Sequence, residues 1–362
     1  MAISRPKILA AAALALAFGS IGRPASGEPR GRGGAQEPAR SLPDHGTGRA
    51  TPARSGDETA RSIARLADAL KRHPARRVPM VGDRHRLYMM DLVESRTTLI
   101  ADETEPGFNW CNEPKWSQDG TRIIFATWPL PGFERCRIKL ILSRDGLPRC
   151  VDLGPGHSPT FSPDDRRIAF TLEPGSEEGE PGVWVMQADG SGRRRVSEAY
   201  GTSFWSPDGR EFLLCGYAQE HTIINLEMKE AGILEVPGRK ISSWPSWAGP
   251  GTLISALGPG EEGDSIALLD VRQPAEAKVI EVLWKRSDGP DVNPRWPVYR
   301  EDTRVCIFVG EEPTQRLLLS VKRGVPGRVK RLEPRGYNDK LGGLAFSPDG
   351  RYLLFCGNRP AP

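Results

Sequence analysis

The stretch Trp205-Ser-Pro-Asp-Gly209, followed by the apolar run Phe212-Leu-Leu214, decides the fold because it recurs along the chain. In each repeat an aromatic residue, here called the anchor, ends one strand, a tight turn follows, and an apolar strand comes next. Four clear and two degenerate repeats have their anchors at Trp116, Phe161, Trp205, Trp247, Trp296 and Phe346. Their spacings of 45, 44, 42, 49 and 50 residues are typical of the blades of a β-propeller.

A second unit, with the pattern strand–turn–strand, follows each anchor except the last. A sixth such hairpin, residues 87–100, precedes the first anchor instead. The N-terminal hairpin would therefore complete the sheet that the C-terminal anchor opens, and the ring would close without a free edge. The sequence thus predicts an all-β, six-bladed β-propeller of four-stranded blades, preceded by one short helix. Its last blade would be closed by strands from both chain ends, within residues 84–108 and 337–362.

The repeat, together with strands such as Val183-Trp-Val-Met-Gln-Ala-Asp-Gly190, resembles the TolB-type, WD-repeat-like propeller repeats over residues 84–360. The resemblance implies an exported, non-catalytic scaffold that binds a protein or peptide in the cell envelope. Members of the TolB family carry an α/β domain ahead of the propeller, where this sequence predicts only a tether and one helix. The same repeat also occurs in peptidase accessory domains and lyases, so it is specific for architecture more than for function.

The N-terminal segment has the pattern of an export signal. Arg5 and Lys7 precede the apolar run Ile8–Phe18, and small residues follow at Ala25-Ser26-Gly27. The alternative is a membrane anchor, but this run is well short of the roughly 20 residues that span hydrocarbon. We therefore expect residues 1–27 to be a signal peptide and the protein to be periplasmic or secreted.

Three further segments complete the expected organisation. Residues 28–56 are rich in Arg, Gly and Pro and predict a disordered tether. Residues 57–83 predict a short helix and a connector, because a capping-box pattern at Ser55–Glu58 precedes Ile63, Leu66 and Leu70 on one helical face. We expect this face to dock on the propeller, residues 84–362; the alternative is a helix that binds a partner or a membrane surface.

Charge and motifs exclude several classes of function. The net charge of +4 is misleading, because residues 1–80 hold 14 Lys and Arg against 6 Asp and Glu, and the remainder is slightly acidic. We therefore expect no nucleic-acid partner, and no further stretch that could cross a bilayer. The sequence has no Gly-x-Ser-x-Gly, His-Glu-x-x-His, phosphate-loop or dinucleotide motif, and five histidines give little basis for a metal site. We expect a monomer without cofactor or metal.

The segments that precede the anchors should share one face of the propeller, here called the top face. They supply the candidate binding residues Asn112, Glu113, His157, Thr202, Trp244, Asp291 and Asn293. His157 and Glu113 begin adjoining blades and are the leading candidates for a binding site at the mouth of the central pore. The alternative is that His157 only bonds a loop carbonyl, since a single histidine lacks partners. Trp244 could stack on a ligand ring or pack beneath the fourth blade.

A propeller enzyme is the alternative function. Carboxylates that meet across the top face, such as Glu113 and Asp291, could act as a glycoside hydrolase pair, or the site could serve a lyase. The spacing of these residues in the sequence does not test this alternative.

Cysteines in an exported chain favour pairing. Cys215 and Cys356 occupy equivalent places in opposite blades and cannot bond to each other. Cys111 and Cys136 should both lie at the top of the first blade, and we predict a disulfide between them. The alternative is six unpaired cysteines, several of them buried in strands.

Overall fold

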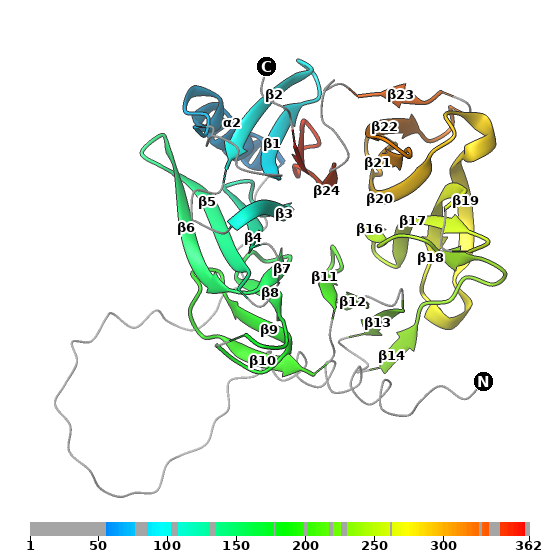
Figure 1. The fold of residues 1–362 in the computed structure, drawn as a ribbon, viewed down its shortest axis with the longest axis horizontal. Coiled ribbons are helices and arrows are strands. Elements are labelled where there is room, and N and C mark those ends of the chain that lie inside the picture. Colours follow the sequence, from blue (N-terminus) through cyan, green and yellow to red (C-terminus); the bar gives the residue numbers. More distant parts are fainter. Residues whose placement is uncertain are drawn as a thin grey trace, which may run out of the picture.

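The computed structural model describes residues 56–76, 85–102, 108–129, 135–176, 178–198, 201–216, 220–225, 230–260, 263–325, 328–332 and 341–358. Within them, six antiparallel sheets form a ring of blades (Figure 1). The predicted signal peptide (1–27) and the predicted tether (28–56), apart from Gly56, lie outside the described residues. The six-bladed propeller fold is confirmed.

The first three blades each contain four strands in sequence order, from the inside of the ring outward. Blade 1 consists of β3 (Phe108–Trp116), β4 (Arg122–Pro129), β5 (Arg137–Arg144) and β6 (Leu147–Pro155). Blade 2 consists of β7 (His157–Phe161), β8 (Arg167–Leu172), β9 (Gly182–Gln187) and β10 (Arg194–Ser197). Blade 3 consists of β11 (Thr202–Trp205), β12 (Glu211–Cys215), β13 (His221–Asn225) and β14 (Glu230–Ile233).

Blade 4 differs because its inner strand is split in two, and both halves pair with the next strand. It consists of β15 (Lys240–Ile241), β16 (Ser246–Gly249), β17 (Thr252–Gly258), β18 (Ser265–Asp270) and β19 (Lys278–Lys285), with 3-10 turns η2 (Pro274–Glu276) and η3 (Arg286–Asp288) on either side of β19. Blade 5 consists of β20 (Asn293–Arg300), β21 (Val305–Glu311), β22 (Arg316–Lys322) and β23 (Lys330–Arg331). The innermost strands of all six blades lie nearest the centre of the ring (Figure 1).

Blade 6 is built from both ends of the propeller. Its strands are β24 (Gly342–Phe346), β25 (Tyr352–Gly357), β1 (Arg86–Asp91) and β2 (Arg96–Ala101), in the spatial order β2-β1-β25-β24. β1 pairs antiparallel with β25 in an unbroken register that places Tyr88 opposite Phe355. The predicted ring closure is therefore confirmed.

The core is divided among the junctions between blades. Six hydrophobic clusters each join residues of two neighbouring blades, one cluster per junction. Successive side chains of a strand point to opposite faces of its sheet. On β25, Leu353 and Phe355 accordingly enter the cluster shared with blade 5, whereas Tyr352 and Leu354 enter the cluster shared with blade 1.

The repeated turn holds its shape through its serine. Ser206 is fully buried; its hydroxyl donates to Asp208 over 2.7 Å and accepts from the Glu211 amide over 2.9 Å. Gly209 has a φ of 73°, in the left-handed region that glycine favours. Ser117, Ser162 and Ser347 repeat this arrangement in blades 1, 2 and 6. The motif is structural, because its polar groups bond within the turn.

One helix, α2 (Gly56–Arg72), covers the junction between the last and first blades. Ile63, Leu66 and Leu70 are buried there, which confirms the predicted apolar face and its docking on the propeller. Acidic residues occupy its first turn and basic residues its last, as the helix dipole favours. Among the described residues, no helix is long and apolar enough to cross a membrane.

A buried carboxylate ties this helix to both strands of the closure. Asp91, at the end of β1, is 0% exposed. It lies 2.8 Å from the Lys71 ammonium of α2 and 3.0 Å from the Arg351 guanidinium, next to β25. Burial raises the pKa of the Asp91 carboxyl, but the hydrogen bonds from Lys71, Arg351 and two backbone amides outweigh burial and lower the pKa to about 2.

This cluster predicts a defined loss of stability in acid. Because the pKa of Asp91 falls from 3.8 to about 2 on folding, its contribution is present above pH 4 and disappears as the pH falls through 2. A shift of this size corresponds to about 2 kcal/mol. Urea unfolding of the wild type and of Asp91→Asn should differ by about that amount at pH 5 and converge near pH 2. A difference that does not change with pH would contradict the assignment.

The predicted disulfide between Cys111 and Cys136 is wrong. Cys111 lies on β3 and Cys136 immediately precedes β5, and β4 lies between these strands. Strands two places apart are separated by roughly 9–10 Å, beyond the limit of about 7 Å between the Cα atoms of a disulfide. The structure accordingly does not join these two residues. The prediction placed both residues at one end of the blade but did not consider the strand between them.

Candidate functional site

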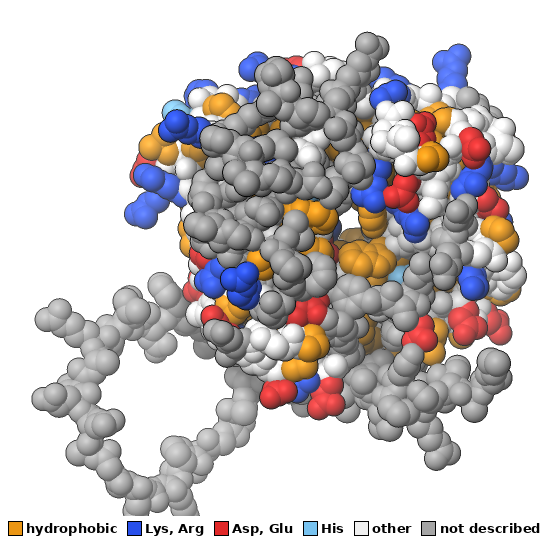
Figure 2. Space-filling view, in the orientation of Figure 1, with side chains coloured by type: hydrophobic (Ala, Val, Ile, Leu, Met, Phe, Trp, Pro, Cys, Tyr) orange, Lys and Arg blue, Asp and Glu red, His pale blue; other side chains and the backbone are white. Residues whose placement is uncertain are grey.

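The inner strands enclose a central cavity of about 1060 Å³. Figure 2 shows it as a hollow in the middle of one face, with hydrophobic side chains inside. Seven of the chain's nine tryptophans line it: Trp110, Trp116, Trp128, Trp205, Trp244, Trp247 and Trp296. A cavity of this size, at the upper end of the range for small-molecule pockets, has room for a ligand of several residues.

A tetrapeptide with proline second and an aromatic residue fourth builds the wall in four of the six blades. Its copies are Glu113-Pro-Lys-Trp116, Ser158-Pro-Thr-Phe161, Trp244-Pro-Ser-Trp247 and Trp296-Pro-Val-Tyr299. Proline lacks the amide that a strand ladder requires and is tolerated where the ladder is interrupted. In blades 1, 2 and 5 the pairing register shifts at this tetrapeptide, which therefore marks a bulge in each inner strand.

The bulges hold unusual backbone conformations. Glu113, Ser158 and Trp296 have φ of 52°, 52° and 48°, although none is glycine. Such conformations are strained for bulky residues and persist only where surrounding structure enforces them. At Trp296 the backbone amide is fixed by the Ser243 hydroxyl over 2.8 Å. The third residues of the tetrapeptides and their equivalents in the other two blades lie around the cavity: Lys115, Thr160, Phe204, Ser246, Val298 and Ala345.

This alignment corrects one anchor. Trp296 is not the anchor of blade 5, because it occupies the bulge position of Glu113, and the anchor is Tyr299, three residues later. The proline at the second position of both tetrapeptides was the sequence signal for this equivalence. Trp296 is consequently a cavity residue. The Arg316 guanidinium lies over its ring, 5.0 Å from the ring centroid.

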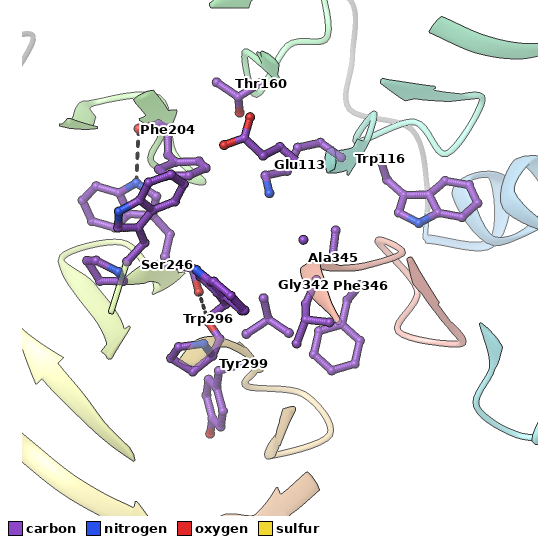
Figure 3. Close-up of a pocket in the computed structure, with 18 of the residues that line it drawn as sticks. Glu113, Trp116, Thr160, Phe204, Ser246, Trp296, Tyr299, Gly342, Ala345 and Phe346 are labelled. Carbon is purple, nitrogen blue, oxygen red and sulfur yellow. Dashed lines mark hydrogen bonds between the residues drawn. The ribbon is translucent and has the colours of Figure 1, made fainter. Parts of the chain in front are cut away.

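Glu113 is the outstanding polar residue of the cavity. It is 8% exposed, and neither oxygen of its carboxylate has a hydrogen-bond partner. Figure 3 shows the carboxylate at the edge of the cavity, directed toward Thr160, with Trp296 on a separate wall. Lys115, two residues along β3, holds its ammonium 5.2 Å from the centroid of the Phe204 ring. Burial lowers the pKa of the Lys115 ammonium, and the negative charge of Glu113 opposes that change.

Two arginines stand at the top of the cavity beside Trp296. Arg295 lies 3.3 Å from Glu311, and Arg316 lies 2.7 Å from the same carboxylate. These hydrogen bonds, with the charges of both arginines, lower the pKa of Glu311 despite its partial burial. Both arginines therefore share one carboxylate partner, whereas the Glu113 carboxylate accepts no hydrogen bond.

Of the seven predicted site residues, the structure brings Asn112, Glu113 and Trp244 to the cavity. Within the described residues, the cavity lining does not include His157, Thr202, Asp291 or Asn293. The Asp291 side chain is 89% exposed and lies 3.6 Å from Arg286. Asn293 accepts a hydrogen bond of 2.9 Å from the Gly263 amide and positions that loop. Asp291 therefore does not meet Glu113 across the cavity.

His157 lies in a buried polar cluster between blades 2 and 3. Its Nε2 is 2.8 Å from Glu173, and its Nδ1 is 2.8 Å from the Ser158 hydroxyl, which lies 3.0 Å from the Thr202 hydroxyl. His157, Ser158 and Thr202 are each at most 2% exposed. His157 was expected at the cavity mouth, but these contacts hold its side chain within the blade junction. Its partners are side chains rather than the loop carbonyl of the alternative.

A second buried histidine, His221, also lies away from the cavity. It is 1% exposed, is not part of the cavity lining, and burial lowers its pKa to about 4. In the described part of the chain, no group of three or more His, Cys, Asp or Glu side chains could hold a metal ion.

Solved β-propellers are similar to this chain. TolB from Acinetobacter baumannii is 14% identical, with 84% of this chain and 70% of that chain covered and a TM-score of 0.43. The β-propeller domain of the Trilobed protease from Pyrococcus furiosus is 14% identical, with coverage of 66% and 88% and a TM-score of 0.41. Oligogalacturonate lyase from Vibrio parahaemolyticus is 15% identical, with coverage of 77% and 73% and a TM-score of 0.41. No protein-family model and no curated protein matches the chain. Sequence identities and TM-scores this low do not assign a function to the chain.

The carboxylates of the cavity lie at different depths. Besides Glu113, the carboxylates among the described lining residues are Glu301 and Asp302. Glu301 accepts a hydrogen bond of 2.7 Å from Tyr299, and Asp302 accepts one of 2.9 Å from Arg300. Both follow the anchor of their strand, whereas Glu113 precedes its own anchor by three residues. The ring of anchors therefore lies between Glu113 and these two carboxylates, among the lining residues that the structure describes.

Proposed function

We propose that this protein is an exported, non-catalytic binding protein of the cell envelope, TolB-like in its role, whose propeller takes a peptide segment of a partner protein into the central cavity. The observation that carries the proposal is the tryptophan-lined cavity with a single unpartnered buried carboxylate. Tryptophan supplies large, rigid contact area and is the residue type that most often dominates peptide and protein binding. The signal-like residues 1–27 support export.

The polar groups of the wall fit a peptide. Serine and threonine hydroxyls, Asn112, Lys115 and the interrupted inner strands can exchange hydrogen bonds with peptide amides, while the tryptophans accommodate apolar side chains. The absence of a second carboxylate beside Glu113, among the described lining residues, gives the glycoside hydrolase alternative no support. Hydrolysis of an oligosaccharide by the purified protein would support the glycoside hydrolase alternative instead.

Replacing Trp244 and Trp296 together by alanine is expected to weaken peptide binding by at least about 10-fold, as loss of two central aromatic contacts does at interfaces. Peptides would first be selected on the immobilised wild-type protein from a random library, and their affinities then measured by calorimetry. Trp184→Ala is the matched control, because Trp184 packs on Phe170 in blade 2 and is not part of the cavity lining. Equal loss in the control, or selection of no peptide, would contradict the proposal.

A further inference from the structure

The buried carboxylate of Glu113 has no hydrogen-bond partner, and its burial destabilises the protein when no ligand is bound. A buried ionised group without hydrogen bonds or a counter-charge loses several kcal/mol of hydration free energy. Glu113 is nevertheless held in place, because it occupies a bulge at φ 52° and is followed by Pro114, whose ring restricts the backbone. The side chain is thus held in the cavity without a partner from the described protein.

The neighbouring lysine does not neutralise this carboxylate. Lys115 influences Glu113 electrostatically, but it donates no hydrogen bond to either oxygen of the Glu113 carboxylate. Its ammonium instead lies over Phe204, at 5.2 Å from the ring centroid. The cavity wall therefore contains a buried carboxylate that has no hydrogen-bond partner and an ammonium group that an aromatic ring already stabilises.

Several aromatic rings of the cavity wall already contact positively charged side chains of the protein itself. Arg316 lies over Trp296, at 5.0 Å from the ring centroid, and Arg167 lies over the anchor Trp205 at 5.3 Å. Together with Lys115 over Phe204, these contacts show that rings of the lining accept positive charge on their faces. A carboxylate surrounded by such rings is chemically suited to a cation, because hydrogen bonds between two charged groups are about twice as strong as neutral ones.

We propose that Glu113 binds the ammonium or guanidinium group of a lysine or arginine side chain carried by the bound peptide. This inference rests on the proposed peptide-binding function and assigns its specificity to one residue. The peptide's aromatic or aliphatic residues contact the tryptophans, and its basic side chain reaches the carboxylate between Thr160 and Phe204 (Figure 3). Lys115 opposes the incoming charge and so limits affinity.

The test uses two sets of blocked hexapeptides with identical phenylalanine content, one carrying a single lysine and the other norleucine at the same position. Binding to the purified protein is measured as a change in the fluorescence of the tryptophans that line the cavity. The wild type should bind the lysine peptides about 10- to 100-fold more tightly than the norleucine peptides. Glu113→Gln should abolish this preference while leaving norleucine binding unchanged, which also shows that the variant is folded.

Lys115→Met is the matched variant, and it should change the affinity for the lysine peptides in the opposite direction to Glu113→Gln. Removing the like charge should raise affinity for the lysine peptides by about 3- to 10-fold. A preference that persists in Glu113→Gln, equal wild-type affinity for both sets, or weaker lysine-peptide binding in Lys115→Met would each overturn the assignment to Glu113. Failure of both sets to bind the wild type would instead overturn the peptide-binding function, and the inference with it.

Discussion

Replacing Phe355 by alanine is expected to lower the free energy of unfolding by about 4 kcal/mol, the usual range for a fully buried phenylalanine being about 3–5 kcal/mol. Phe355 is 0% exposed in β25 and packs between blades 5 and 6. Its ring stacks on Tyr88 of β1, with centroids 5.4 Å apart and an interplanar angle of 17°. The loss would be measured by urea denaturation.

A double-mutant cycle makes this prediction specific to the ring closure. Tyr88 and Phe355 are 267 positions apart in the chain but directly opposite in the sheet. Tyr88→Ala, Phe355→Ala and the double variant should therefore reveal a coupling energy of about 1 kcal/mol. Additive effects would contradict a shared sheet. The same single change at Phe212 in blade 3, also 0% exposed, should be comparably destabilising but additive with Tyr88→Ala.

Replacing Leu66 of α2 by alanine is expected to lower the free energy of unfolding by about 3 kcal/mol. Leu66 is 1% exposed and belongs to the core cluster that joins the helix to blades 6 and 1. The helix thus covers the junction at which the two chain ends meet. Thermal and urea unfolding would measure the loss.

Arg65→Ala is the control for this change, because Arg65 is the exposed neighbour on the same helix. It should alter stability by no more than about 0.5 kcal/mol. A helix that served chiefly as a partner-binding or membrane-surface element would tolerate Leu66→Ala as well as Arg65→Ala. That outcome would show that the helix does not contribute to the stability of the propeller.

The fold was largely predictable because its information is local and repeated. Each Ser-Pro-Asp-Gly turn satisfies its polar groups internally, so the turn forms wherever the pattern occurs. The offset between anchors and hairpins then allows only one way to complete the last sheet, and the pairing of β1 with β25 confirms it. The helix was predictable for the same reason, since its buried face follows from a local 3.6-residue period.

The candidate site was predicted only in part, because it depends on how the inner strands depart from regular pairing. In an unbroken strand, side-chain direction follows from alternation, but each bulge changes the phase. Glu113 and His157 were both expected at the mouth of the pore, but Glu113 lines the cavity and His157 lies in a blade junction. The repeated proline tetrapeptide was visible in the sequence and would have identified Lys115 and Trp296.

Periodic patterns and self-contained turns were enough to predict the number of blades, the closure of the ring and the buried face of the helix. The three-dimensional arrangement was needed to show that seven tryptophans meet around one cavity, that Asp291 stays outside it, and that Glu113 and Lys115 form no hydrogen bond with each other. These relations join residues of different blades, or depend on strand bulges. Their distances are set by the curvature of the whole ring and by no local pattern.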